Sequence, residues 1–125
     1  MSIKLVENYD KAMNEIWLPI TGYEGRYEVS ERGVRSLKTG NPLATRRIGG
    51  TSGSRYLAYS LYREDGYHTK TFHALLAEAF IGPRPDGMYV LHRDDDPDNN
   101  IIENLYYGTP SENNFDQVRN GVHPK

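Results

Sequence analysis

The chain has 125 residues, 37% of them hydrophobic and 26% charged, which predicts an ordinary globular protein of one domain with room for a small lobe. It has no apolar stretch of membrane-spanning length and no signal-peptide pattern, so we expect a cytoplasmic protein with no membrane partner. The absence of cysteine excludes disulfides and thiolate zinc sites. Any metal would therefore be held by His, Asn, Asp or Glu, which suits one Mg²⁺ or Mn²⁺ ion.

The net charge of −2 is divided unevenly along the chain. Residues 1–70 carry 11 Lys and Arg against 8 Asp and Glu, whereas residues 71–125 carry 4 against 9. A mildly basic region beside an acidic one fits a DNA-docking part next to a cation-binding part. A charge difference of this size also arises by chance in globular proteins.

The first half of the chain predicts short elements separated by turns. Residues 8–17 predict a short helix that ends at Pro19. Residues 27–29 and 34–37 predict strands around a turn at 31–33, and a second turn is expected at 39–42. Residues 46–55 are rich in Gly and Ser, which predicts a loop that is mobile until it meets a partner.

The second half predicts a hairpin, a helix and a strand–loop–strand–helix unit. In chain order, we expect strands at 56–62 and 67–72, a helix at 73–80, strands at 88–92 and 104–107, and a helix from 109 to about 120. Thr109, Pro110 and Glu112 give the last helix a capping pattern. The mixture of antiparallel strands and helices predicts an α+β fold.

Basic and aromatic side chains gather around the predicted hairpin. The tyrosines are Tyr56, Tyr59, Tyr62 and Tyr67, and the candidate DNA-binding residues near them are Arg46, Arg47, Arg55, Arg63 and Lys70. Basic residues beside aromatics suit contacts to phosphate and sugar. A sheet with tyrosines on both faces explains the cluster equally well. The 46–55 loop is the stronger candidate for DNA contact because its glycines allow the backbone to approach a groove.

Three polar residues mark the strand–loop–strand–helix unit. His92 ends the strand at 88–92, where a neutral imidazole is suited to act as a general base. The return strand brings Asn104 alongside, where its amide oxygen would orient the imidazole, and Asn113 lies one turn into the final helix. Against this, a single strand histidine is usually structural and an asparagine at a turn is usually a turn former.

Four stretches within residues 70–123 resemble the HNH endonuclease family of phage and intron-encoded homing enzymes. They are FHALLAEAF at 72–80, VLHRD at 90–94, NN at 99–100 with ENL at 103–105, and GT at 108–109 with SENN at 111–114. Upstream, ITGYEGRYEVS at 20–30 and GVRSL at 33–37 resemble the NUMOD-type module that often precedes such nucleases. Together the resemblances cover most of the chain.

The resemblance implies a ββα-metal finger with three matched positions. His92 matches the general base, Asn104 the residue that orients the base and holds the loop, and Asn113 a metal ligand. The residue before the base is often a metal-binding Asp, but Leu91 stands there. Asp116 shares a helix face with Asn113 and is the candidate substitute ligand. Asp94 is a second candidate, although it is as well placed to cap a turn.

The resemblance implies a metal-dependent DNA endonuclease. Residues 1–70 would form a β-rich region docking on double-stranded DNA, and residues 71–125 the nuclease domain. A monomer would nick one strand, and a double-strand break would need a homodimer or a phage protein partner. For a phage-encoded chain the location would be the host cytoplasm. Two alternatives are a catalytically weak DNA-binding protein that retains the HNH fold, as Leu91 suggests, and an accessory nuclease of a phage packaging machine.

Overall fold

The computed structural model describes residues 9–10 and 15–109. Its elements, in chain order, are β1 (Tyr9–Asp10), β2 (Glu15–Ile16), β3 (Leu18–Pro19), β4 (Tyr27–Ser30), β5 (Gly33–Ser36), β6 (Arg46–Ile48), β7 (Tyr56–Arg63), β8 (Gly66–Thr71), α2 (Phe72–Phe80), β9 (Tyr89–His92), the 3₁₀ helix η1 (Ile102–Asn104) and β10 (Leu105–Gly108). Small antiparallel sheets around one described helix confirm the α+β fold. The helix expected after residue 109 lies outside the described residues.

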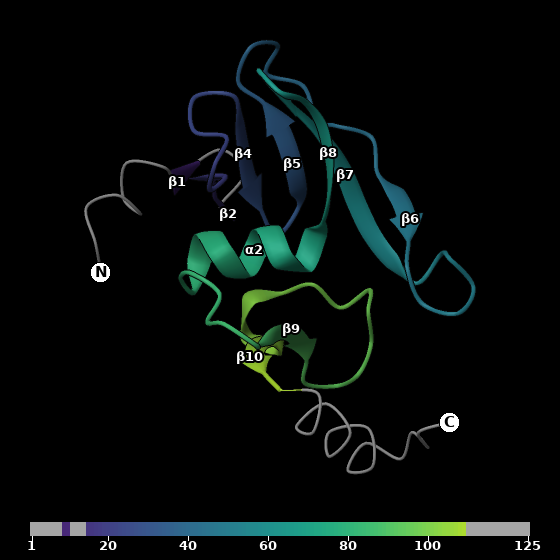
Figure 1. Ribbon diagram of the computed structural model, residues 1–125. Coiled ribbons are helices and arrows are strands. Elements are labelled where there is room, and N and C mark those ends of the chain that lie inside the picture. Colours follow the sequence, from purple (N-terminus) through teal and green to yellow (C-terminus); the bar gives the residue numbers. More distant parts are fainter. Residues whose placement is uncertain (1–8, 11–14, 110–125) are drawn as a thin grey trace.

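The strands within the described residues form four antiparallel sheets. Their strand orders are β1-β2, β3-β4-β5, β6-β7-β8 and β10-β9. Figure 1 shows α2 lying across the molecule, with the larger sheets on one side and the β9–β10 hairpin on the other. The helix therefore connects the part of the chain that resembles the NUMOD module to the part that resembles the HNH finger.

One hydrophobic core extends across both of these parts. Its buried members are Ile20, Tyr23, Val29, Val34, Tyr59, Leu61, Phe72, Leu75, Leu76 and Leu105. Leu75 and Leu76 of α2 join the two parts, because the core also contains strand residues from β4, β5 and β7 and Leu105 from β10. Packing on a shared core fixes the β9–β10 hairpin relative to the larger sheets.

The helix predicted over residues 8–17 is wrong where the structure describes that segment. Tyr9 pairs with Ile16 and Asp10 with Glu15 in an antiparallel ladder, and Leu18 then pairs with Val29. Trp17 and Leu18 are both buried, at 7% and 3% exposure. Burial of adjacent residues against a sheet decides the conformation here, and it overrides a weak local helix pattern.

The irregular loop predicted over residues 46–55 is wrong for its first three residues. Arg46, Arg47 and Ile48 form the edge strand β6, which pairs with residues 56–58 of β7. The side chains of Arg46 and Arg47 are exposed, so the segment has the polar composition of a loop. Backbone hydrogen bonds to β7 determine its strand conformation. Such bonds do not require a particular pattern of side chains, so the sequence does not reveal them.

At Gly33, the first residue of β5, both the backbone conformation and the limited space around the residue require a glycine. Its φ of 139° is disfavoured for residues with a side chain. A Cβ at this position would also lie 2.9 Å from the hydroxyl oxygen of Tyr59. Burial raises the pKa of that tyrosine, which is 3% exposed. The turn between β4 and β5 thus closes directly over the core.

The described helix, α2, is short. None of the helices in residues 9–10 and 15–109 has the length and apolar character needed to cross a membrane.

Candidate active site

His92 is the last residue of β9 and is held by the hairpin that β9 makes with β10. It pairs with Leu105, and the preceding Leu91 pairs with Tyr106. The backbone amide of Arg93 continues the ladder by donating to the carbonyl of Asn104 at 2.8 Å. Only 7% of His92 is exposed. A short, well-anchored hairpin therefore presents a nearly buried imidazole at the start of the loop that follows.

Asparagine and aspartate side chains fold the loop after His92. Asp94 Oδ1 accepts from the amide of Asp96 at 2.9 Å and from Asn104 Nδ2 at 3.0 Å, while Oδ2 accepts from Asn99 Nδ2 at 2.6 Å. Asp96 Oδ1 in turn accepts from the amide of Asp98 at 3.0 Å. Desolvation raises the pKa of Asp94, but its hydrogen bonds together lower that pKa below the ordinary value. The acidic run is thus a series of Asx turns.

Asn104 is buried in the base of this loop, with 7% exposure. Its Nδ2 donates to the carbonyl of Asn99 at 2.8 Å and to Asp94 Oδ1, and its Oδ1 accepts from the amide of Asp94 at 3.2 Å. These contacts hold the loop, which is one of the two roles predicted for it. The other role differs, because the contact to the His92 imidazole is made by Asn100.

Asn100 Oδ1 lies 2.8 Å from His92 Nε2, in a buried contact. Asn100 is 7% exposed, and its Nδ2 donates to the carbonyl of Pro97 at 3.2 Å. The asparagine therefore bridges the loop backbone and the imidazole. It belongs to the Asn-Asn pair within the HNH-like stretch, but in a loop this rich in polar residues no spacing rule distinguishes it from its neighbours.

The ring of His73 covers another side of His92 and is itself in contact with the ring of Tyr56. The ring centroids of His73 and His92 are 4.9 Å apart, and those of His73 and Tyr56 are 5.1 Å apart. Burial lowers the pKa of His73 to about 4, with a smaller contribution from His92. His73 is therefore neutral at pH 7. His73 at the start of α2 thus lies between His92 and Tyr56 of β7, a contact that the sequence does not reveal.

Two ion pairs join the loop after His92 to the β6–β7 region. Arg47 Nη1 lies 2.9 Å from Asp98 Oδ1, and Arg55 Nη2 lies 3.8 Å from Asp95 Oδ1. Asp95 adopts a φ of 61°, a left-handed conformation uncommon outside glycine, and its amide donates to the carbonyl of His92 at 3.0 Å. Two residues predicted to bind DNA are thus engaged with the acidic loop.

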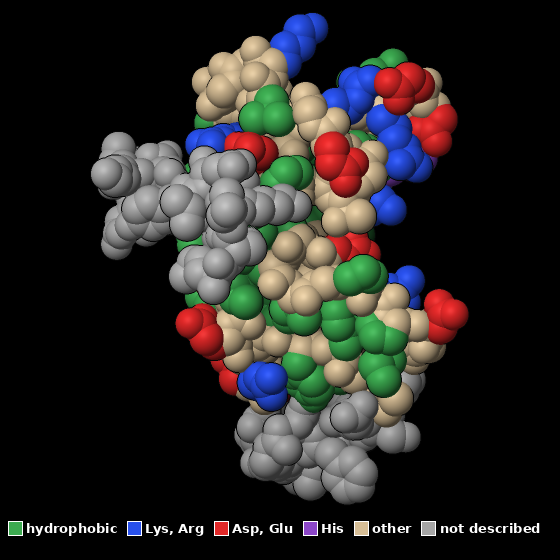
Figure 2. Space-filling view, turned by 90° about the vertical axis from the view of Figure 1, so that its left-hand side faces the viewer, with side chains coloured by type: hydrophobic (Ala, Val, Ile, Leu, Met, Phe, Trp, Pro, Cys, Tyr) green, Lys and Arg blue, Asp and Glu red, His purple; other side chains and the backbone are tan. Residues whose placement is uncertain are grey.

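The other predicted DNA-binding residues lie on different surfaces. Arg46 is exposed, and because it precedes Arg47 on a strand, the two side chains leave opposite faces. Lys70 is exposed on β8. Arg63 ends β7, where its guanidinium bonds Asp65 at 3.1 Å and lies over the ring of Tyr23. Figure 2 shows Lys and Arg interspersed with Asp and Glu over the upper, β-rich part of the face in view.

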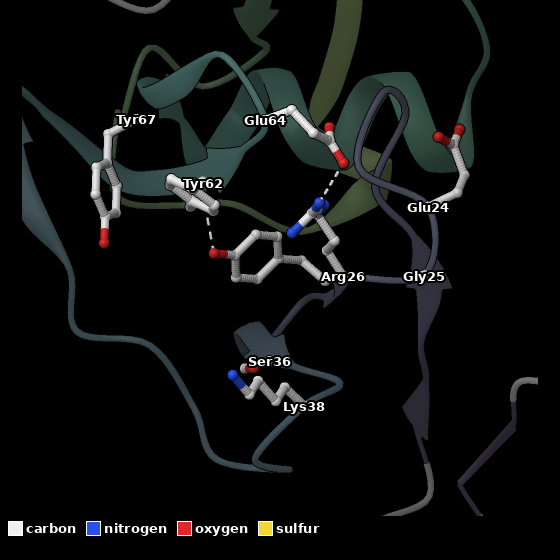
Figure 3. A pocket seen from close by; sticks show the side chains of 9 residues that line it. Glu24, Gly25, Arg26, Ser36, Lys38, Tyr62, Glu64 and Tyr67 are labelled. Atoms are coloured by element: carbon white, nitrogen blue, oxygen red, sulfur yellow. Dashed lines mark hydrogen bonds and ion pairs between the residues drawn. The ribbon is translucent and has the colours of Figure 1, made fainter.

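The four tyrosines of the β7–β8 hairpin divide into two pairs. Tyr59 belongs to the core and Tyr56 contacts the ring of His73, whereas Tyr62 and Tyr67 are 41% and 74% exposed. The exposed pair lines an open hollow of about 750 Å³, together with Glu24, Gly25, Arg26, Tyr27, Ser36, Lys38 and Glu64. Figure 3 shows an ion pair between Arg26 and Glu64 at one side of the hollow and Lys38 at another. Its two cations and two carboxylates leave it without net charge.

The predicted metal ligands Asn113 and Asp116 lie outside the described residues. Within residues 9–10 and 15–109, no group of three or more His, Cys, Asp or Glu side chains is arranged to hold a metal ion. Leu91 is 7% exposed and packs in the interior, and the Asp94 carboxylate is committed to the Asx turns. The described part of the site thus supplies His92, the Asn100 side chain that contacts it and the Asn104 side chain that holds the loop.

Two known sequence families match successive parts of the chain. Residues 15–73 match the NUMOD4 motif, and residues 70–115 match a family described as HNH endonuclease. The chain is 33% identical over 118 residues to DNA endonuclease I-HmuI of Bacillus phage SP01, an alignment that covers 85% of the chain and 59% of that protein.

A solved structure agrees with the sequence match. The chain resembles the structure titled "DNA binding and cleavage by the HNH homing endonuclease I-HmuI", with a TM-score of 0.73 and 33% identity over 87% of this chain and 61% of that one. The chain thus spans about three fifths of its relative's length. The chain is thus homologous to the phage homing endonuclease I-HmuI over most of its own length, with a match to the NUMOD4 motif ahead of a match to the HNH endonuclease family.

Proposed function

We propose that this chain is a divalent-metal-dependent DNA endonuclease that hydrolyses one phosphodiester bond per monomer, with His92 as the general base. The observation that supports it most directly is the position of His92. This histidine stands at the end of a hairpin, is nearly buried, and has one ring nitrogen held by Asn100 at 2.8 Å. An imidazole oriented on one side is suited to take a proton on the other.

In the proposed reaction, the imidazole accepts a proton from a water molecule whose oxygen forms a bond to phosphorus. The bond between phosphorus and the 3′ oxygen breaks and that oxygen takes a proton from solvent, so that one side of the nick ends in a 3′ hydroxyl and the other in a 5′ phosphate. A bound divalent cation would supply charge stabilisation at the phosphate and the leaving oxygen. Asn113 and Asp116 are the residues we propose to hold it.

Residues 1–70 are proposed to dock on double-stranded DNA and residues 71–125 to cut it. Arg46, Arg47 and Arg55 lie on or beside β6, and Arg47 and Arg55 contact the loop that follows His92. Phosphates bound along β6 would therefore lie beside the hairpin that holds the base. Arg63 and Lys70, on other parts of the β7–β8 hairpin, would extend the contact along the duplex.

A second function rests on Leu91. The chain would then be a DNA-binding protein that retains the HNH fold with weak or no cleavage, because an apolar, buried side chain stands where the family often has a metal-binding Asp. The two functions share DNA binding and differ in chemistry, so an activity assay separates them.

Nicking of supercoiled plasmid tests the proposal. Wild-type protein with Mg²⁺ or Mn²⁺ should convert supercoiled DNA to the open-circular form, and EDTA should abolish this conversion. Asn113→Ala and Asp116→Ala should raise the metal concentration required for half-maximal rate. Cleavage that persists in EDTA would refute metal dependence. Tight DNA binding without cleavage under any divalent cation would favour the second function.

A further inference from the structure

We infer that Asn100 is a positioning residue that sets which ring nitrogen of His92 acts as the base. By accepting a hydrogen bond from Nε2, Asn100 keeps the proton on that nitrogen and leaves the lone pair on Nδ1. This inference rests on the proposed function and deepens it, because it identifies Nδ1 as the atom that receives the proton from water. The proposed function uses the Asn100 contact to orient the ring, and it does not assign the tautomer of His92.

The carbonyl of Pro97 determines the orientation of the Asn100 amide. A carbonyl oxygen only accepts hydrogen bonds, so the group 3.2 Å from it must be the NH₂ end of Asn100. The opposite orientation would place two acceptor oxygens against each other. The Asn100 oxygen therefore faces His92, at 2.8 Å from Nε2. Because that oxygen only accepts, Nε2 must carry a hydrogen, and in the neutral ring Nδ1 carries the lone pair.

The loop gives this arrangement a rigid frame. The amide of Asn99 donates to the carbonyl of Asp96 at 3.1 Å, and Asn104 Nδ2 donates to the carbonyl of Asn99 at 2.8 Å. Pro97 lies inside this frame with a fixed φ. Asn100 and His92 are both 7% exposed, so little water competes for their hydrogen bond. The backbone carbonyl of Pro97 orients the Asn100 side chain, and Asn100 in turn selects the tautomer of His92.

Asn104 does not substitute for Asn100 in this role. Both of its amide ends are engaged, by Asp94 and by the carbonyl of Asn99. The two asparagines therefore have separate tasks, in which Asn104 shapes the loop and Asn100 orients the imidazole. This separation supplies a matched control in Asn99, whose side chain also supports the loop but does so by donating to Asp94 at 2.6 Å.

Nitrogen-15 NMR of the histidine rings tests the inference without reference to activity. In the full chain at a pH where His92 is neutral, long-range ¹H–¹⁵N spectra should show Nε2 protonated and Nδ1 unprotonated. Asn100→Leu should convert His92 to a tautomer mixture, whereas Asn100→Asp, which keeps an acceptor oxygen, should retain the wild-type pattern. Asn99→Ala should also retain it. A protonated Nδ1 in the neutral wild-type ring would overturn the inference. This wild-type measurement does not depend on whether Asn100→Leu folds.

Nicking kinetics give the second readout. The single-turnover rate at saturating DNA should fall about 10- to 100-fold in Asn100→Leu, with unchanged DNA affinity and partial recovery in Asn100→Asp. Equal losses in Asn99→Ala and Asn100→Leu, in rate and in ring spectra alike, would show a general loop effect and overturn the inference. If the wild type does not nick DNA but its His92 shows the expected tautomer, the proposed function fails while the role of Asn100 on the ring stands.

Discussion

Arg47 of β6 and Asp98 of the loop after β9 form an ion pair 2.9 Å long across 51 residues of sequence. The pair links the part that matches NUMOD4 to the part that matches the HNH family. Both side chains are about half exposed, at 45% and 53%. A DNA phosphate that binds Arg47 would compete with this carboxylate for the guanidinium, so we expect DNA docking and the loop beside His92 to be energetically coupled.

Removing the Asp98 carboxylate should strengthen DNA binding. Exposed ion pairs stabilise by about 0.2–1 kcal/mol, so Asp98→Asn should tighten binding by at most about fivefold, as measured by fluorescence anisotropy at fixed salt. Asp86→Asn removes the same charge from another exposed loop and controls for general electrostatics. In an Arg47→Ala background, Asp98→Asn should have only the effect of Asp86→Asn. Weaker binding by Asp98→Asn would contradict this competition.

Removing the β6 arginines should weaken binding and make it less sensitive to salt. Each arginine that no longer neutralises a phosphate reduces the slope of log affinity against log salt by about 1. Arg46→Ala/Arg47→Ala should therefore lower the slope by up to about 2, whereas Arg84→Ala, which removes an exposed arginine bonded to the carbonyl of Met88, should leave it unchanged. An unchanged slope in the double variant would move the DNA-binding surface away from β6.

Asn104 should be important for stability irrespective of catalysis. Asn104→Ala leaves the carbonyl of Asn99 and the amide of Asp94 without this partner, which should cost about 1–3 kcal/mol in the free energy of unfolding. Asn104→Asp should cost more at neutral pH, because it places a second carboxylate against Asp94. That excess should shrink in acid as the new carboxyl takes a proton.

Urea denaturation at two pH values measures both effects of the Asn104 substitutions. Asn41→Ala is a suitable control because Asn41 is exposed in a turn, where substitutions usually change stability by less than about 0.5 kcal/mol. Wild-type stability in Asn104→Asp at neutral pH would contradict the hydrogen-bond assignment at Asp94.

His73 should make the fold sensitive to mild acid. Its pKa of about 4 when folded lies below the ordinary value of 6.5, so between these values the unfolded chain binds a proton that the folded chain excludes. Stability therefore falls as the pH drops through 6.5 towards 4. Between pH 7 and 5 the wild type should lose about 2 kcal/mol more than His73→Phe.

A second variant separates proton uptake by His73 from loss of its ring. His73→Leu lacks both the imidazole and the ring contact with His92, so it should be less stable than His73→Phe but share its weaker pH dependence. Urea unfolding at pH 7 and pH 5 provides the comparison. If His73→Phe and His73→Leu lose as much stability in acid as the wild type does, the buried neutral imidazole is not the source of the sensitivity.

The elements predicted correctly are those with a regular spacing of apolar residues and turn residues at their ends. The β7–β8 hairpin around Asp65 and Gly66, the helix α2 and the β9–β10 hairpin all combine apolar periodicity with turn residues, and all are present. Strand β6 and the strands near residue 16 were missed, because pairing with a neighbouring strand, and not their own side chains, defines them.

Only part of the candidate site was predictable, because some of its contacts depend on packing and not on local sequence patterns. The place of His92 at the end of a strand suggests a general base, whereas the resemblance to the HNH family, and not the spacing, implies the loop-holding role of Asn104. The contact of Asn100 with His92 Nε2 depends on the turn at Pro97, which orients the Asn100 amide. The ring contact of Tyr56 with His73 depends on packing between residues distant in sequence. Neither relationship has a sequence period that would reveal it.

The assignment of His92 as the base of a DNA endonuclease underlies the proposed chemistry. Its most direct test is the single-turnover rate at which saturating protein nicks supercoiled plasmid with Mg²⁺ or Mn²⁺, for the wild type and for His92→Ala. Loss of a general base should slow nicking by about 10²- to 10⁴-fold, with plasmid binding unchanged. Nicking by His92→Ala at the wild-type rate would contradict the assignment.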